Sequence, residues 1–145
     1  MYDHILIPTD GSELSRKAVQ AGVDLARKIH ARVTIFNTSP PFPPLTSEVF
    51  VESGEPRRYE AAAELRARGI LEEGERYARE QGVAVDSQHV FATHPHEAII
   101  EAAPKHHCDL IVMASHGRKG MAAMLLGSET TKVLTHSKIP VLVCR

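Results

Sequence analysis

The chain has 145 residues, of which 43% are apolar and 24% are charged, and its 17 Lys and Arg residues nearly balance its 18 Asp and Glu residues. A chain of this length buries roughly 70% of its unfolded surface in one core, so we expect residues 1–145 to form a single domain. The near-zero net charge excludes a bulk electrostatic attraction to nucleic acid or to an anionic membrane.

Short apolar runs alternate with helical periods along the whole chain. In chain order, the pattern predicts a strand at 4–8, a helix at 14–29, a strand at 32–38, a helix at about 57–81, a weaker strand at 84–91, a helix from Pro95, a strand at 109–114, a helix from Gly127-Ser128 and a strand at 140–144. The runs 5–7, 110–113 and 141–143 are apolar on both faces, as strands covered by helices on both sides must be. The sequence therefore predicts an α/β fold with an open, doubly wound parallel sheet.

Residues 39–56 form the one stretch without a predicted element, and they include the proline-rich run 40–44. The stretch is too short for a linker and too long for a plain turn. A lid over a ligand, a partner-docking loop and a simple crossover all remain open.

The apolar run that begins at His4 leaves no room for a signal peptide, and no apolar stretch approaches the ~20 residues of a membrane-spanning helix. The two cysteines, Cys108 and Cys144, lie beside or inside apolar runs, which is typical of buried thiols in a reducing compartment. We therefore expect a cytoplasmic protein without a membrane partner.

Ligands of open parallel sheets bind beyond the carboxyl ends of the strands, where this chain has two notable loops. The first is Pro8-Thr9-Asp10-Gly11-Ser12, and the second runs from Ser115 to Ser128. Gly117 and Gly127 allow backbone N–H groups to approach a phosphate, the helix that opens at Ser128 offers unpaired N–H donors, and Arg118 adds positive charge.

An alternative interpretation is that Gly127-Ser128 only caps a helix and that the basic stretch is a solvated turn. Asp10 has a comparable alternative, because Asp-Gly after a strand is a common turn and helix-start signal. The second loop has neither the Gly-x4-Gly-Lys-Ser/Thr spacing of a P-loop nor the Gly-x-Gly-x-x-Gly spacing of a dinucleotide site, so a nucleotide site here is of another kind.

Three parts of the sequence together resemble the universal stress protein family: the segment 113–117, the Gly127-Ser128 pair that follows after nine intervening residues, and the run 138–143. The ATP-binding members of that family carry Gly-x2-Gly-x9-Gly-Ser/Thr. The segments 5–12 and 31–34 carry the same resemblance, which thus spans nearly the whole chain. The resemblance implies a five-stranded parallel sheet of order 3-2-1-4-5. It also implies a homodimer formed through the last strand, at Val141, Leu142 and Val143.

The resemblance further implies a site for ATP, or for AMP or ADP. Asp10 would contact the ribose, the backbone of Thr38 would read the adenine edge, and the backbone around Gly127 would hold the phosphates with an accompanying Mg²⁺. The residues implied at this site are Pro8, Thr9, Asp10, Thr38, Met113, Ala114, Ser115, His116, Gly117, Arg118, Gly127, Ser128 and Glu129.

Three positions depart from the family pattern. Ala114 replaces the first glycine of the motif, His94 stands where a glycine is common, and Thr38 replaces a more usual aliphatic residue. If position 114 required a positive φ, alanine would cost ~1–2 kcal/mol, which corresponds to a five- to thirtyfold loss of affinity. If Ala114 keeps ordinary strand geometry, its methyl group costs little.

We expect no metal ligands, because His94 and His96 lie about 15 Å from 106–108, at the other end of one helix. Catalysis by Ser115-His116 is disfavoured, because neighbours along a strand point to opposite faces and no Gly-x-Ser-x-Gly elbow is present.

We therefore expect an ATP-binding regulatory module of the stress response with slow or no hydrolysis and no catalytic residue. The alternatives are a nucleotide-independent dimeric interaction module of the same fold, or a weak ATPase.

Overall fold

The computed structural model describes residues 1–43, 54–117 and 126–145. In chain order, its elements are β1 (His4–Pro8), α1 (Glu13–Ile29), β2 (Arg32–Ser39), α3 (Glu55–Glu80), β3 (Val85–Phe91), α4 (Pro95–Lys105), β4 (Leu110–Ala114), α5 (Ser128–His136) and β5 (Val141–Cys144). Each boundary that the sequence predicts lies within two residues of the one observed. Most of the irregular stretch 39–56 lies outside the described residues.

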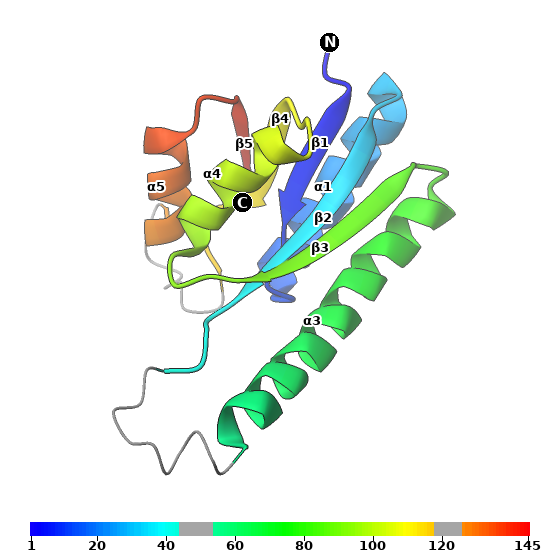
Figure 1. The fold of residues 1–145 in the computed structure, drawn as a ribbon. Helices are drawn as coiled ribbons and strands as arrows, with labels where there is room; N and C mark the ends of the chain where they lie inside the picture. The colour runs from blue at the N-terminus through cyan, green and yellow to red at the C-terminus, as the bar shows by residue number, and fades with distance from the viewer. Residues whose placement is uncertain (44–53, 118–125) are drawn as a thin grey trace.

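The five strands form one parallel sheet of order β3-β2-β1-β4-β5, which confirms the predicted topology (Figure 1). The central strand β1 pairs with β2 on one side and with β4 on the other, so that Ile5 is in register with Val33 and with Leu110. The direction in which the strands are added reverses between β1 and β4. This is the switch point at which ligands of such sheets bind.

Helices cover both faces of the sheet, with α1 and α3 on one side and α4 and α5 on the other (Figure 1). Successive side chains of β1 alternate between the two layers: Ile5 and Ile7 pack toward α1 and α3, and Leu6 packs toward α4 and α5. All three are fully buried, and burial of each side chain contributes about 1.5–3 kcal/mol to folding. The doubly apolar strands of the sequence are thus explained by two separate cores.

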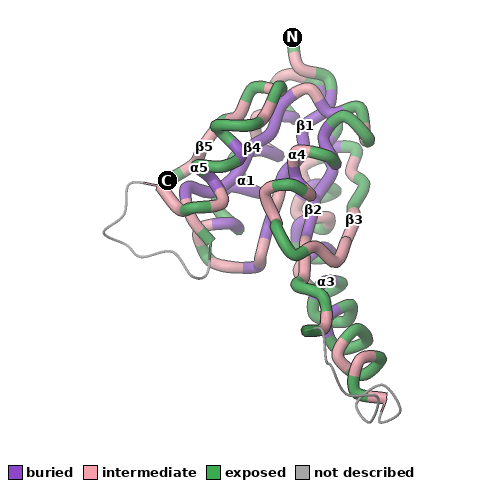
Figure 2. Tube along the Cα trace, turned by 60° about the vertical axis from the view of Figure 1, so that its left-hand side comes forward, coloured by how far each residue is buried: buried purple, intermediate pink, exposed green. Residues whose placement is uncertain are grey.

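The helix α3 is 26 residues long, and its N-terminal turns extend past the sheet, where most of its surface is exposed (Figure 2). A stripe of small side chains, including Ala67 and Ala78, packs on the sheet, whereas Leu65 points outward and is 67% exposed. No helix within the described ranges is long and apolar enough to cross a membrane.

Candidate functional site

The loop after β1 makes a tight turn around Asp10. Asp10 Oδ1 accepts a hydrogen bond from the backbone N–H of Ser12 at 2.9 Å, and Gly11 has a positive φ of 79°. Ser12 then caps α1 by accepting from the N–H of Ser15 at 3.3 Å. The turn and helix-start roles expected of this Asp-Gly pair are therefore present, and they fix the Asp10 carboxylate at the carboxyl end of β1.

Thr9 is buried and uses its polar groups inside the protein. Its hydroxyl lies 3.0 Å from Ser15 Oγ and accepts from the N–H of Gly11 at 3.2 Å, while its carbonyl accepts from Asn37 Nδ2 at 2.8 Å. The Thr9 N–H also donates to the carbonyl of Phe36. These bonds hold the ends of β1 and β2 together. Pro8, half-buried, is the last residue of β1.

The loop after β4 returns to its own strand before α5 begins. The N–H of Gly127 donates to the carbonyl of Ser115 at 2.7 Å, and Thr130 Oγ1 donates to the carbonyl of Ala114 at 2.9 Å. Gly127 is the N-cap of α5 and offers no side-chain acceptor, and Ser128 is exposed at the first helical position. The first N–H groups of α5 therefore have no side-chain cap from Gly127.

Two glycines of this loop permit close packing. A Cβ atom on Gly117 would lie 2.6 Å from Asp10 Oδ2, and one on Gly127 would lie 2.9 Å from Cβ and 3.0 Å from Cα of His116. Neither glycine has a positive φ, so close approach and not backbone conformation requires them. The structure thus brings Asp10, Gly117, Gly127 and Ser128 together, although the first is about 110 residues from the others.

Ala114 is the last residue of β4, pairs with Cys144 and is 8% exposed. Its φ is not positive, because the only non-glycine residues with positive φ in the described ranges are His30 and His107. Ala114 therefore keeps ordinary strand geometry, which is the second of the two possibilities considered for this position. Its methyl group imposes no backbone strain. Met113 and Ser115 on either side are also buried.

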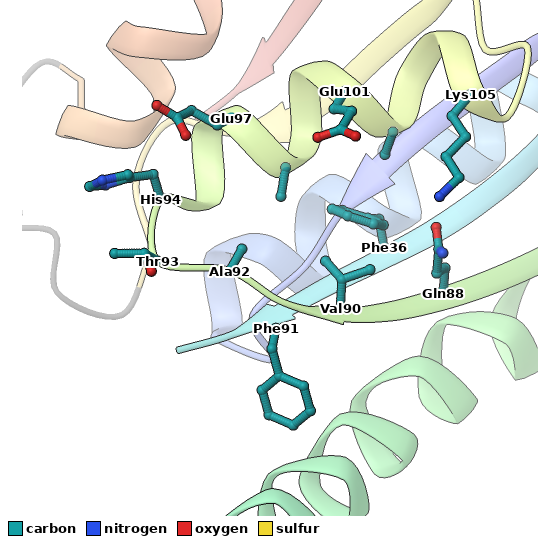
Figure 3. A pocket seen from close by; sticks show the side chains of 12 residues that line it. Phe36, Gln88, Val90, Phe91, Ala92, Thr93, His94, Glu97, Glu101 and Lys105 are labelled. Carbon is teal, nitrogen blue, oxygen red and sulfur yellow. The ribbon is translucent and has the colours of Figure 1, made fainter. Parts of the chain in front are cut away.

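A groove of about 520 Å³ lies between β3 and α4 (Figure 3). Phe36 and Val90 form its floor, and the α4 side chains Glu101 and Lys105 stand along one wall (Figure 3). None of the residues that the sequence predicts for the site lines it. However, one end of the groove, at 92–94, adjoins β2, because the N–H of Ala92 donates to the carbonyl of Ser39.

That end of the groove lies beside Thr38. Thr38 is half-buried near the end of β2 and is in register with Val90 of the groove floor. The backbone at Thr38 is therefore next to the groove. No local sequence pattern indicates the groove, because it depends on how far α4 lies from the edge strand β3.

Glu129 binds the neighbouring helix. Its Oε2 accepts from the backbone N–H of His96 at 2.7 Å and from His96 Nδ1 at 2.9 Å. The carboxylate thereby caps α4, whose own N-cap residue His94 makes no side-chain cap bond. The sequence placed Glu129 in the expected site but gave no sign of His96 as its partner, because the two residues lie on different helices.

The Ser115 hydroxyl lies 3.2 Å from His116 Nδ1, so the argument that the two side chains point to opposite faces was wrong. Both residues lie beyond the end of β4, where strand alternation no longer applies. Arg118, the remaining residue of the expected site, lies outside the described residues.

Among the residues described, no group of three or more His, Cys, Asp or Glu side chains is arranged to hold a metal ion. His106 instead contacts the Gln88 side chain, and Cys108 is buried at the opposite end of the sheet from Asp10. Burial raises the pKa of the Cys108 thiol to about 11, which keeps it protonated at neutral pH.

Comparison with known proteins gives one consistent result. The universal stress protein family model matches residues 1–145. A universal stress protein of Thermus aquaticus is 31% identical over 145 residues and covers all of both chains.

Solved structures agree with that match. MJ0577 of Methanocaldococcus jannaschii superposes with a TM-score of 0.77 at 29% identity, over 99% of this chain and 96% of that one. A universal stress protein solved in complex with cAMP superposes with a TM-score of 0.72 at 26% identity, over 99% and 97% of the two chains. These likenesses extend over nearly the full length of each chain.

Proposed function

The chain belongs to the universal stress protein family, and on that premise we propose that it is a regulatory module of the stress response that binds an adenine nucleotide, ATP by preference. The observation that carries the proposal is the contact between the Asp10 loop and the glycine loop that opens α5. A Cβ on Gly117 would collide with Asp10, so the backbone of one loop touches the carboxylate of the other. The two loops form one site at the switch point of the sheet.

The phosphates would lie at the N-terminus of α5. The backbone N–H groups there and the positive end of the helix dipole favour an anion, and the exposed Ser128 hydroxyl can donate to it. The N-cap Gly127 has no side chain of its own to occupy the start of the helix. A Mg²⁺ ion would be held mainly by phosphate oxygens and water, as its preference for few protein ligands allows.

The nucleoside would lie between the first loop and the end of β2. The Asp10 carboxylate is a hydrogen-bond acceptor suited to ribose hydroxyls, and the backbone at Thr38 can pair with the adenine edge beside the groove end at 92–94. The ordinary backbone of Ala114 removes the main objection to binding. The relative solved with cAMP supports an adenine nucleotide as the class of ligand.

We also propose that the chain is one domain that forms a homodimer in the cytoplasm. The edge strand β5 presents Leu142, which is 45% exposed, and Leu134 of α5 is 40% exposed. An unpaired strand edge beside exposed leucines favours pairing with a second copy. Both cysteines are unpaired thiols, which fits a reducing compartment.

Calorimetric titration of chelator-washed protein with ATP, AMP and adenosine, with and without Mg²⁺, tests the proposal. We expect micromolar ATP binding, a loss of ribose-dependent affinity in Asp10→Asn, and a loss of phosphate-dependent affinity in Ser128→Ala. Thr135→Ala is the matched control, because Thr135 is exposed near the other end of α5. No binding heat and no shift in melting temperature at millimolar ATP would replace the proposal with a nucleotide-independent interaction module.

A further inference from the structure

A contact between α4 and α5 bears on the phosphate site, and its interpretation rests on the proposed function. The helix α5 carries an acidic residue in its first turn, Glu129, beside the N–H groups to which phosphates would bind. An acidic side chain at this position ordinarily turns toward the N-terminus of its own helix, where the dipole attracts it. There it would occupy or repel the position of an anionic ligand.

In this chain the Glu129 carboxylate turns to the other helix. Its Oε2 accepts hydrogen bonds from the backbone N–H of His96 at 2.7 Å and from His96 Nδ1 at 2.9 Å. Since a carboxylate can only accept, Nδ1 carries a proton, and one oxygen holds both donors. The His96 side chain is only 12% exposed, so the imidazole is fixed by packing, whereas the Glu129 side chain is 39% exposed.

The other charged groups near the pair make weaker contacts. Lys132 lies one turn further along α5, with its Nζ 3.9 Å from Glu129 Oε1, and Glu97 Oε1 lies 4.0 Å from His96 Nε2. The Lys132 and Glu97 side chains are largely exposed, so these two ion pairs contribute little to holding the Glu129 side chain in place. The two short hydrogen bonds from His96 therefore set the direction of the Glu129 side chain.

We propose that His96 is a positioning residue for nucleotide binding, which holds the Glu129 carboxylate at the N-terminus of α4 and so keeps the N-terminus of α5 open to phosphate. His96 itself touches no phosphate in this arrangement. Without it, the carboxylate returns to the start of α5 and opposes each phosphate charge. The effect grows with the number of phosphates on the ligand and is absent for a ligand that has none.

The test is calorimetric titration of wild type, His96→Ala and the double variant His96→Ala/Glu129→Gln with ATP, AMP and adenosine. We expect His96→Ala to weaken ATP binding about tenfold, AMP binding less, and adenosine binding not at all, since a unit charge about 6 Å away at an intermediate dielectric acts with this strength. The double variant removes the released charge and restores ATP affinity. His136→Ala, an exposed histidine at the far end of α5, is the matched control and leaves all three affinities unchanged.

A merely structural role for His96 gives a different pattern. If losing the α4 cap only disorders the region, ATP and adenosine affinities fall by the same factor and the double variant does not recover, which overturns the inference. If ATP affinity in His96→Ala equals that of wild type, the inference is wrong while the proposed function stands. If wild type binds none of the three ligands, the proposed function fails and the inference fails with it.

Discussion

Gly117 packs directly on the carboxylate of Asp10, since a Cβ atom added to Gly117 would lie 2.6 Å from Asp10 Oδ2. Gly117→Ala must therefore push the Asp10 carboxylate aside and disturb its hydrogen bond with the Ser12 N–H. Because Asp10 is the proposed ribose contact, we expect the affinity for ATP and for adenosine to fall together by about tenfold, or ~1.4 kcal/mol. Calorimetry measures both, and an unchanged adenosine affinity would remove Asp10 from the ribose site.

Gly127 and Gly69 give opposite outcomes for the same substitution. Alanine at 127 meets Cα of His116 at 3.0 Å and the carbonyl of Ser115 at 3.3 Å, which are backbone atoms that cannot yield easily. We expect Gly127→Ala to lower the free energy of unfolding by about 1–3 kcal/mol. Gly69 lies within α3 with nothing within 4 Å of an added Cβ, so Gly69→Ala should raise it by roughly 0.5–1 kcal/mol. Urea denaturation measures both, and equal effects would contradict the packing argument.

The sequence predicts the elements well for a local reason. Runs such as Ile5-Leu6-Ile7 carry the two-faced apolar pattern of a covered parallel strand, and Ser12 and Pro95 mark helix starts. The family resemblance added the strand order, which local pattern alone does not determine.

The contacts that shape the site depend on distances between helices, and no local pattern encodes these. The capture of Glu129 by His96 joins residues 33 positions apart on two helices. The groove likewise depends on the distance between β3 and α4, because residues of both elements line it. The relative directions of Ser115 and His116 were wrongly predicted, because these residues lie one and two positions past the end of β4, where strand alternation does not hold.

The stability of the protein should depend on pH through His4. Burial, reinforced by the Arg32 guanidinium, lowers the pKa of His4 below its ordinary value of 6.5, and the imidazole Nε2 bonds Thr34 Oγ1 at 2.8 Å. Between pH 6.5 and the lowered pKa the unfolded chain binds more protons, so the free energy of unfolding falls as the pH falls through that window.

His4→Gln should flatten this dependence. Urea midpoints at about pH 7.5 and pH 5.5 measure it, with the exposed His136→Gln as control. Some dependence persists in His4→Gln, because burial also lowers the pKa of His89. A pH dependence as steep as that of wild type would show that His4 is not its source.

The proposed dimer gives a further prediction. Leu142→Asp places a charge on the exposed face of the edge strand β5, and we expect it to yield a monomer in light scattering coupled to size exclusion. Leu65→Asp is the control, because Leu65 is even more exposed but lies on α3. A dimer that survives Leu142→Asp but not Leu65→Asp would move the interface to α3.

The central position of β1 in the sheet has a consequence for folding of the protein during its synthesis on the ribosome. This strand is synthesised before the other four, yet one of its two neighbours is β4. The Asp109 carboxylate, just before β4, accepts hydrogen bonds from the backbone N–H groups of Asp3 and His4, more than 100 residues earlier. Until that later stretch leaves the exit tunnel, one long edge of β1 has no partner. The nascent chain must therefore keep the apolar strand β1 without one of its two neighbours for most of translation, and we expect the requirement for chaperones to be greatest in that interval.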